Sequence, residues 1–263
     1  MNPTTENSTP GCPPSATAFL SARDLDSHGF FLAPLLQPGF DVLDAGCGPA
    51  TITSGIAEMV FPGRVMAVDP SASQLEKGRR LAEGREIMNL DFVAASVCEM
   101  PFADHSFDVV FSHALLEHLP APDRALAEFH RVTRPGGFIG LCCPDWAAVD
   151  TDDLPRKAAL AVNAFQNLLE RKGGHLHAGA QLPRWLTRAG FTPLACDSWM
   201  EEHGDVQPLA EYLAHPLEAA GEAAHARALR EWAQDPNARF RLAWRYVTGV
   251  RADEARFHRH GAE

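Results

Sequence analysis

Short apolar runs alternate with amphipathic stretches between about residues 40 and 138 of the chain. The apolar runs have the length of buried strands, and the stretches between them place apolar residues at helical spacing. The expected strands are 41–45, 64–68, 90–94, 107–112 and 138–143. The expected helices are 51–60, 71–84 and 121–133, with Ser71 as an N-cap and Gln74 in the capping-box position. This alternation predicts a parallel sheet whose strands are joined by crossover helices.

The pattern outside this segment is looser and mostly helical. A helix over 16–36 is expected to lie over the mouth of a ligand site in the sheet. Towards the C-terminus we expect helices at 154–172 and 181–189, one or two helices over 207–234, a strand starting near Phe191 and a last strand at 241–250. Residues 1–15 are rich in Ser, Thr, Pro and Gly, so we expect them to form a disordered tail. We expect residues 16–263 to form one domain. Its core would be about 40–145, with substrate-selecting cap insertions at about 146–180 and 200–238.

Composition narrows the class of protein. A chain of 263 residues suits one α/β domain with insertions, and its formal charge of −11 argues against a surface that neutralises a nucleic-acid backbone. The six cysteines show no C-x-x-C spacing, so neither a zinc framework nor a disulfide framework is expected. No uncharged apolar run reaches the ~20 residues that span a bilayer, and the first 15 residues lack a targeting pattern. We expect a cytoplasmic protein with no membrane span.

The most informative segment runs from Val42 to Ala50, an apolar run that ends in Asp44 and a glycine pair. Gly46 and Gly48 let the backbone turn tightly from strand to helix, so that a ligand can lie against the main chain at Cys47. Asp69, followed by Pro70, ends the next apolar run and is placed to accept the two hydroxyls of a ribose. The two turns together predict a bound nucleoside.

The charge of these turns indicates which nucleoside binds. A dinucleotide fingerprint needs a third glycine where this chain has Thr51, and Asp44 would place a carboxylate close to a pyrophosphate. S-adenosylmethionine has no phosphate and carries an ammonium and a sulfonium group, so a carboxylate beside the glycine turn is favourable. S-adenosylmethionine is therefore favoured over NAD.

At this point the chain resembles the class I S-adenosylmethionine-dependent methyltransferases, whose first motif reads acidic-x-Gly-x-Gly-x-Gly. Here Ala50 stands at the last glycine. Further similar segments follow in order, and they are 93–102, 106–110, 116–120 and 131–137. The resemblance implies a Rossmann-like, mostly parallel seven-stranded sheet flanked by helices, with helical cap insertions. It also implies that Ser96, at the position of a family aspartate, and the Val97 amide contact the adenine.

Ser112 and His113 end the fourth expected strand, at the sheet edge where open α/β folds bind ligands. Ser112 is assigned to the cofactor, and His113 is a candidate base, with pocket wall as the alternative. His118 is the second catalytic candidate. Glu117 and His118 also resemble a pair in metal-binding quinone and small-RNA methyltransferases, but the preceding ligand position is Ala114, so no metal is expected. His175, His177 and His203 are assigned no role.

The resemblance implies methyl transfer to a small, partly apolar acceptor by in-line displacement, with S-adenosyl-L-homocysteine as product. One alternative is an RNA or protein acceptor, although Ser112 to Leu115 replace the Asn/Asp-Pro-Pro-aromatic motif of such enzymes. Another is a non-catalytic module that binds S-adenosyl-L-methionine. The sequence leaves open which molecule accepts the methyl group, whether carbon, oxygen or nitrogen is methylated, whether a base is used, and whether the chain forms a homodimer.

Overall fold

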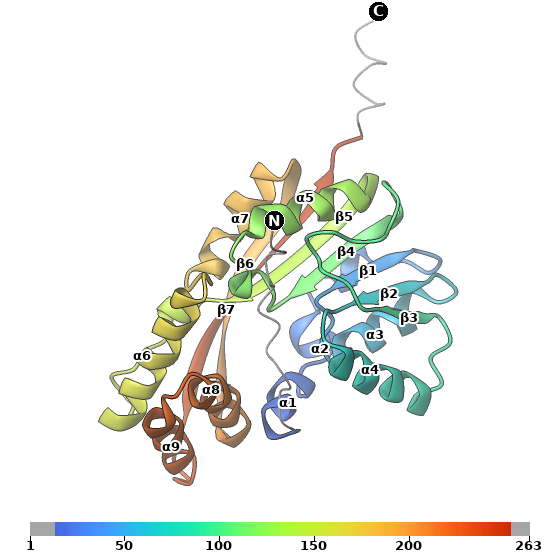
Figure 1. Ribbon diagram of the computed structural model, residues 1–263. Helices are drawn as coiled ribbons and strands as arrows, with labels where there is room; N and C mark the ends of the chain where they lie inside the picture. The colour runs from blue at the N-terminus through green and yellow to red at the C-terminus, as the bar shows by residue number, and fades with distance from the viewer. Residues whose placement is uncertain (1–13, 254–263) are drawn as a thin grey trace, which may run out of the picture.

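The computed structural model describes residues 14–253. Within them, a single sheet of seven strands forms the centre of the fold, in the order β3-β2-β1-β4-β5-β7-β6 (Figure 1). The strands are β1 (Val42–Ala45), β2 (Val65–Val68), β3 (Leu90–Val93), β4 (Phe107–His113), β5 (Thr133–Pro144), β6 (Phe191–His203) and β7 (Phe240–Arg251).

The first five strands pair in parallel, and β7 alone runs opposite to the other strands of the sheet. Val42 of β1 pairs with Val65 on one side and with Val109 on the other. β7 runs antiparallel between β5 and β6, in register from Phe138↔Val250 to Pro144↔Trp244 on the β5 side. The expected Rossmann-like, mostly parallel seven-stranded sheet is confirmed.

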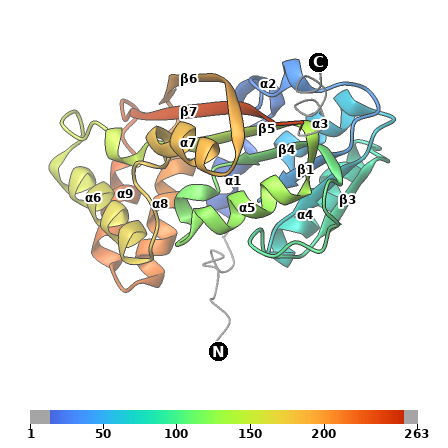
Figure 2. The same cartoon turned by 90° about the horizontal axis from the view of Figure 1, so that it is seen from above.

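Helices cover both faces of the sheet (Figure 2). They are α1 (Pro14–Ser21), α2 (Leu25–His28), α3 (Thr51–Val60), α4 (Ala72–Gly84), α5 (Pro122–Val132), α6 (Arg156–Arg171), α7 (Ala178–Arg188), α8 (Gln207–Ala219) and α9 (Ala223–Trp232), with short 3-10 turns η1 (Ala33–Leu35), η2 (Leu116–His118) and η3 (Trp146–Ala148). Alternate strand residues face opposite layers. Val42 and Phe111 pack in the cluster that contains α3, whereas Leu43 and Val110 pack with α5 and α7.

Helices α6, α8 and α9 gather at the end of the sheet away from β3, as both views show (Figures 1 and 2). Their buried side chains, among them Phe165, Leu213 and Leu229, belong to the same core cluster as α3. The cluster also includes Phe19 of α1. The first helix and three late helices therefore share one core. No helix among the described residues has both the length and the apolar surface needed to cross a membrane.

The helix expected over 16–36 is wrong as one element. The segment forms α1, α2 and η1, because Asp24 starts a new helix by accepting a hydrogen bond from the Ser27 amide at 2.8 Å. Helix α1 begins at Pro14, so it overlaps the expected tail at its last two residues, and residues 1–13 lie outside the described residues.

The capping box expected at Ser71 and Gln74 is also wrong. Ser71 precedes α4, but its side chain makes no cap hydrogen bond and lies 3.0 Å from the Ser73 hydroxyl. The Ser71 amide instead donates to Asp69, at 2.8 Å. The entry into α4 is therefore tied to the end of β2 by a carboxylate.

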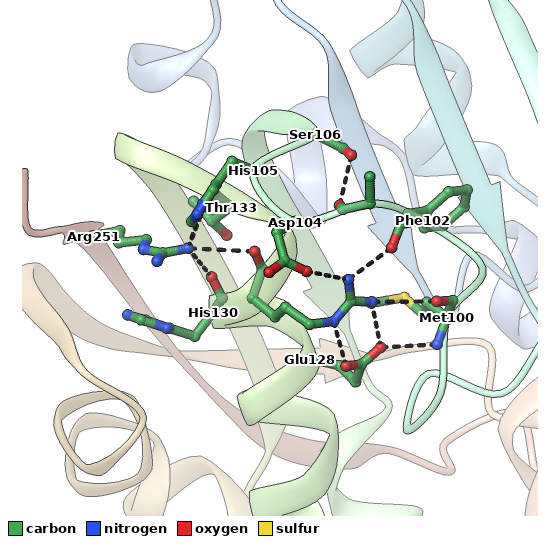
Figure 3. A network of polar contacts seen from close by, with 11 residues as sticks. Met100, Phe102, Asp104, His105, Ser106, Glu128, His130, Thr133 and Arg251 are labelled. Atoms are coloured by element: carbon green, nitrogen blue, oxygen red, sulfur yellow. Dashed lines mark hydrogen bonds and ion pairs between the residues drawn. The ribbon is translucent and has the colours of Figure 1, made fainter.

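The connection between β3 and β4 is held against α5 by polar contacts, and Figure 3 shows Met100, Phe102 and Asp104 of this connection together with Glu128 of α5. Arg131 donates to the carbonyl oxygens of Phe102 and Met100 at 2.7 and 3.2 Å, and it pairs with Asp104 and Glu128. Glu128 in turn accepts a hydrogen bond from the Met100 amide at 2.9 Å. These contacts fix a connection that has little regular structure of its own.

Candidate functional site

The turn after β1 is bound to the end of β2 through its backbone. The amides of Gly46 and Cys47 both donate to the Val68 carbonyl, at 2.8 and 3.0 Å. Gly46 and Gly48 have φ of +82° and +53°, a region in which a side chain is strained. A Cβ on Gly46 would press on Leu115 at 3.0 Å, whereas a Cβ on Gly48 would meet no atom within 4 Å. The backbone at Gly48 is therefore open to a ligand.

Asp69 joins the two turns. One carboxylate oxygen accepts the Gly48 amide at 3.0 Å, and the other accepts the Ser71 amide at 2.8 Å. The carboxylate is thus held at the end of β2, beside the open face of the glycine turn. That is the position in which a ribose would be bound through its hydroxyls.

Asp44 lies at the base of the same turn and is 2 % exposed. Burial raises the pKa of its carboxyl group to about 7, and the like charge of Asp69 acts in the same direction. A hydrogen bond from the Thr53 hydroxyl, at 2.6 Å, opposes this shift. Asp44 therefore changes charge near neutral pH and favours a cationic ligand group when ionised.

One pocket brings most of the predicted residues together. We call its first part the glycine-turn end, which is lined by Asp44, Gly46, Cys47, Gly48, Asp69, Pro70, Ser71 and Val97. The predicted His113 and His118 line the same pocket.

Two predicted cofactor residues, Ser96 and Ser112, are not among the lining residues. The Ser96 hydroxyl accepts the Cys98 amide at 3.1 Å. The buried Ser112 hydroxyl donates to the Ala45 carbonyl at 2.8 Å, and so joins β4 to β1. The geometry gives both hydroxyls a role in backbone structure.

A second part of the pocket, which we call the cap end, draws on the segments expected to cover the ligand site, but of its individual residues only His118 was predicted. It is lined by Leu20, Arg23, His118, Phe165, Leu168, Leu169, Lys172, Tyr212, His215 and Pro216. Apart from His118, these residues come from α1 and the residues just after it, from α6 and the residue that follows it, and from α8. Their sequence spacing gives no signal, because only the folded chain brings the three segments together.

His113 is buried against aromatic rings. Its ring stacks on Trp244 with centroids 4.9 Å apart and meets His28 edge-on at 5.3 Å. Its Nε2 atom has no hydrogen-bond partner within residues 14–253. Burial, and then the charges of Arg23 and His28, hold the pKa of His113 well below its usual value. His113 is therefore neutral at physiological pH.

His118 is more accessible than His113, at 31 % side-chain exposure. Its Nε2 lies 3.4 Å from the Tyr212 hydroxyl and 3.7 Å from a carboxylate oxygen of Glu117. Glu117 is itself buried outside the pocket lining, and burial raises the pKa of its carboxyl group. The two neighbours in sequence therefore face different environments.

The other histidines noted in the sequence do not line this pocket. His177 is exposed at 71 %, and His203 lies 3.3 Å from Glu201. Within residues 14–253, no group of three or more His, Cys, Asp or Glu side chains is arranged to hold a metal ion.

Residues 43–141, which run from β1 into β5 and include the glycine turn, match the family model described as a methyltransferase domain. These residues form a methyltransferase domain, of the class I S-adenosylmethionine-dependent type that the order of motifs indicated. The resemblance noted from the ordered motifs is thereby confirmed.

Similar proteins match over this methyltransferase domain. An uncharacterized methyltransferase of Schizosaccharomyces pombe is 41 % identical over 110 residues, which cover 40 % of this chain and 39 % of that protein. A demethylmenaquinone methyltransferase of Geobacillus stearothermophilus is 37 % identical over 104 residues, covering 39 % of this chain and 44 % of that protein. The matched part thus spans about two fifths of each of these relatives.

A solved structure extends the likeness beyond the methyltransferase domain. The geranyl diphosphate C-methyltransferase of Streptomyces coelicolor A3(2) superposes with a TM-score of 0.57 at 17 % identity, covering 90 % of this chain and 82 % of that one. At this identity the comparison shows a shared fold.

Proposed function

We propose that this protein transfers the methyl group of S-adenosylmethionine to a small, partly apolar acceptor. The observation that carries the proposal is the single pocket in which the glycine-turn end and the cap end meet. A donor at one end would face an acceptor at the other. Holding the two reactants in line is the main task of an enzyme whose donor is already activated.

The glycine-turn end fits the donor. The open backbone at Gly48 admits a ligand against the main chain, and the Asp69 carboxylate beside it suits ribose hydroxyls. An ionised Asp44 suits the ammonium of the methionine part, directly or through water. Val97 is buried, lines the same end and is placed to contact the adenine.

When bound, S-adenosylmethionine would supply a methyl group activated by its sulfonium; an acceptor lone pair would bond to the methyl carbon as the carbon–sulfur bond breaks, leaving S-adenosylhomocysteine. The protein contributes position and exclusion of water. Leu168, Leu169 and Phe165 of α6 form an apolar wall at the cap end. His113 lines the pocket, is neutral and has a ring nitrogen without a partner in the described chain, so it would accept a hydrogen bond from the acceptor.

The acceptor is proposed to be a small molecule for two reasons. The cap end is lined by side chains of three helical segments, among which Arg23, Phe165, Leu168 and Leu169 are buried, as suits a ligand of limited size. The formal charge of −11 disfavours a nucleic-acid acceptor.

The first test concerns the donor. Asp69→Ala should weaken binding of S-adenosylhomocysteine by about tenfold or more, the loss expected for about 1.4 kcal/mol of hydrogen bonding. Isothermal titration calorimetry measures this directly. Asp91→Ala is the matched control, since Asp91 is an exposed aspartate of β3 that pairs with Arg64. Unchanged affinity in Asp69→Ala would contradict the assignment of the site.

The second test concerns transfer. The protein is incubated with methyl-labelled S-adenosylmethionine and a cell lysate, and label is counted in the small-molecule, RNA and protein fractions. Label among small molecules supports the proposal, and label in a polymer contradicts it. Absence of label in all three fractions, together with tight binding of S-adenosylhomocysteine, would favour a non-catalytic module.

A further inference from the structure

Arg23 is a buried cation on the wall of the pocket. It lies between α1 and α2, is 7 % exposed and lines the cap end. Its guanidinium carbon is 4.6 Å from the ring centre of Phe19 and 4.8 Å from that of Trp244. The two rings hold the side chain from the sides, as in other cation–π contacts of arginine.

No carboxylate within residues 14–253 forms an ion pair with Arg23, and its guanidinium makes no hydrogen bond there. Glu201 acts on Arg23 only at a distance, since its Oε2 atom accepts the Trp244 indole at 2.6 Å and lies 3.4 and 3.3 Å from His28 and His203. Glu117 is the other acid that acts on it, and burial raises the pKa of that carboxyl group. Burial lowers the pKa of Arg23 itself, although an arginine stays charged.

A buried guanidinium without an acid partner is unfavourable for the folded state unless something else satisfies it. Arg23 presents a planar set of donors, which matches the oxygens of a carboxylate or phosphate. Lys172, His118 and His215 line the same end of the pocket, so basic side chains gather there. The two acids of the pocket, Asp44 and Asp69, lie at the glycine-turn end. The pocket therefore has acidic side chains at the glycine-turn end and basic side chains at the cap end.

We propose that the methyl acceptor carries an anionic group, a carboxylate or a phosphate, which Arg23 binds at the cap end of the pocket. The apolar body of the acceptor then lies against Phe165, Leu168 and Leu169 of α6. This inference rests on the proposed function, because it names the acceptor class of the same pocket. It assigns Arg23 to the binding of the acceptor, whereas the glycine-turn end is proposed to bind the donor.

The test measures binding of three probes to the protein saturated with S-adenosylhomocysteine. The probes are benzoate, phenyl phosphate and benzamide, which share an aromatic ring and differ in the group that Arg23 would bind. Calorimetry should find that at least one of the two anions binds about tenfold or more tightly than the neutral amide, and the preferred anion distinguishes carboxylate from phosphate. Equal binding of all three probes, or binding of none, would overturn the proposal.

The variant Arg23→Met removes the charge and keeps most of the length of the side chain. It should bring the anions to within about twofold of benzamide while binding of S-adenosylhomocysteine is unchanged. Arg64→Met is the matched control, because Arg64 is an exposed arginine paired with Asp91 and should leave the preference intact. An anion preference that persists in Arg23→Met would also overturn the proposal.

Arg23→Lys keeps the charge and loses the planar fork, so it should show an intermediate preference. It serves as the second variant if Arg23→Met does not fold, and a preference equal to that of the wild type would then contradict the role of Arg23. Failure of S-adenosylhomocysteine to bind to the wild type would refute the proposed function instead. The two ideas therefore fail by different readouts.

Discussion

Asp44 shows how burial can link a binding site to pH. Its carboxyl group has a pKa of about 7 because it is buried beside Asp69. A ligand ammonium favours the ionised carboxylate, so binding at low pH must first remove a proton. Affinity should therefore fall as pH falls through 7.

From this we predict that S-adenosylhomocysteine binds about tenfold more weakly at pH 6 than at pH 8, because the ionised fraction of Asp44 falls by about that factor. Calorimetry at pH 6, 7 and 8 measures the change. Asp44→Asn should bind weakly at every pH and lose the dependence. 5′-Methylthioadenosine, which lacks the ammonium, is the control ligand, and a pH slope that survives in Asp44→Asn would exclude this explanation.

Comparing alanine substitutions at Gly48 and Gly39 distinguishes the effect of backbone strain from the effect of blocking the ligand. Gly48 and Gly39 both have positive φ, at +53° and +90°, and a Cβ on either would meet no atom within 4 Å. Only Gly48 lines the pocket. Alanine at either position should lower the free energy of unfolding by about 1–2 kcal/mol, the strain of a left-handed residue.

Gly48→Ala should in addition reduce affinity for S-adenosylhomocysteine by about tenfold or more, because its methyl group would occupy space against which the ligand lies. Gly39→Ala should leave the affinity unchanged. Chemical denaturation and calorimetry on both variants give the two quantities. Equal affinity in the two variants would mean that the ligand does not approach Gly48.

At the scale of elements, the connection between β3 and β4 depends on α5. Arg131 holds the carbonyl oxygens of Met100 and Phe102, just beyond the pocket residue Val97. The hydrogen bonds and ion pairs with Glu128 and Asp104 raise the pKa of Arg131 and keep it charged. The wall of the pocket near Val97 is thus fixed from outside the pocket.

Arg131→Gln should speed amide hydrogen exchange across residues 98–106 and destabilise the fold by about 1–3 kcal/mol, since it leaves backbone carbonyls without their donor. Exchange measured by mass spectrometry locates the effect. Arg188→Gln is the control, because Arg188 forms an exposed pair with Asp123, and such pairs contribute little. A uniform increase in exchange over the whole chain would show that the effect is not local.

Element boundaries illustrate which signals the sequence carries. The helix predicted over 51–60 is observed at those residues, between the glycine turn and Phe61-Pro62. The break of 16–36 at Asp24 was missed, although Asp24 and Ser27 have the spacing of reciprocal capping partners. Ser71 and Gln74 have similar spacing and were predicted to form a capping box, but the Ser71 side chain makes no cap hydrogen bond. The local sequence indicates which residues could cap a helix. Whether they do so depends on tertiary contacts, such as the one between the Ser71 amide and Asp69.

For the whole molecule, the sequence indicated those parts of the pocket whose residues come from consecutive elements of the chain. The glycine-turn end comes from Asp44 to Val97, in which each strand, turn and helix follows the previous one. The cap end joins Arg23 to Lys172 and Tyr212, and no local periodicity relates such distant positions. The fold class could be predicted from the alternation of elements and the order of motifs, whereas the cap end depends on the packing of α1 against α8.

The position of β7 has a consequence for synthesis of the chain. β7 follows β6 in sequence, yet it lies between β5 and β6 in the sheet. Until residues 240–251 have left the ribosome, β5 has an open edge and β6 has no strand to pair with. The nascent chain therefore carries two long unpaired backbone edges until β7 emerges, and these are the surfaces on which premature association with other chains would start.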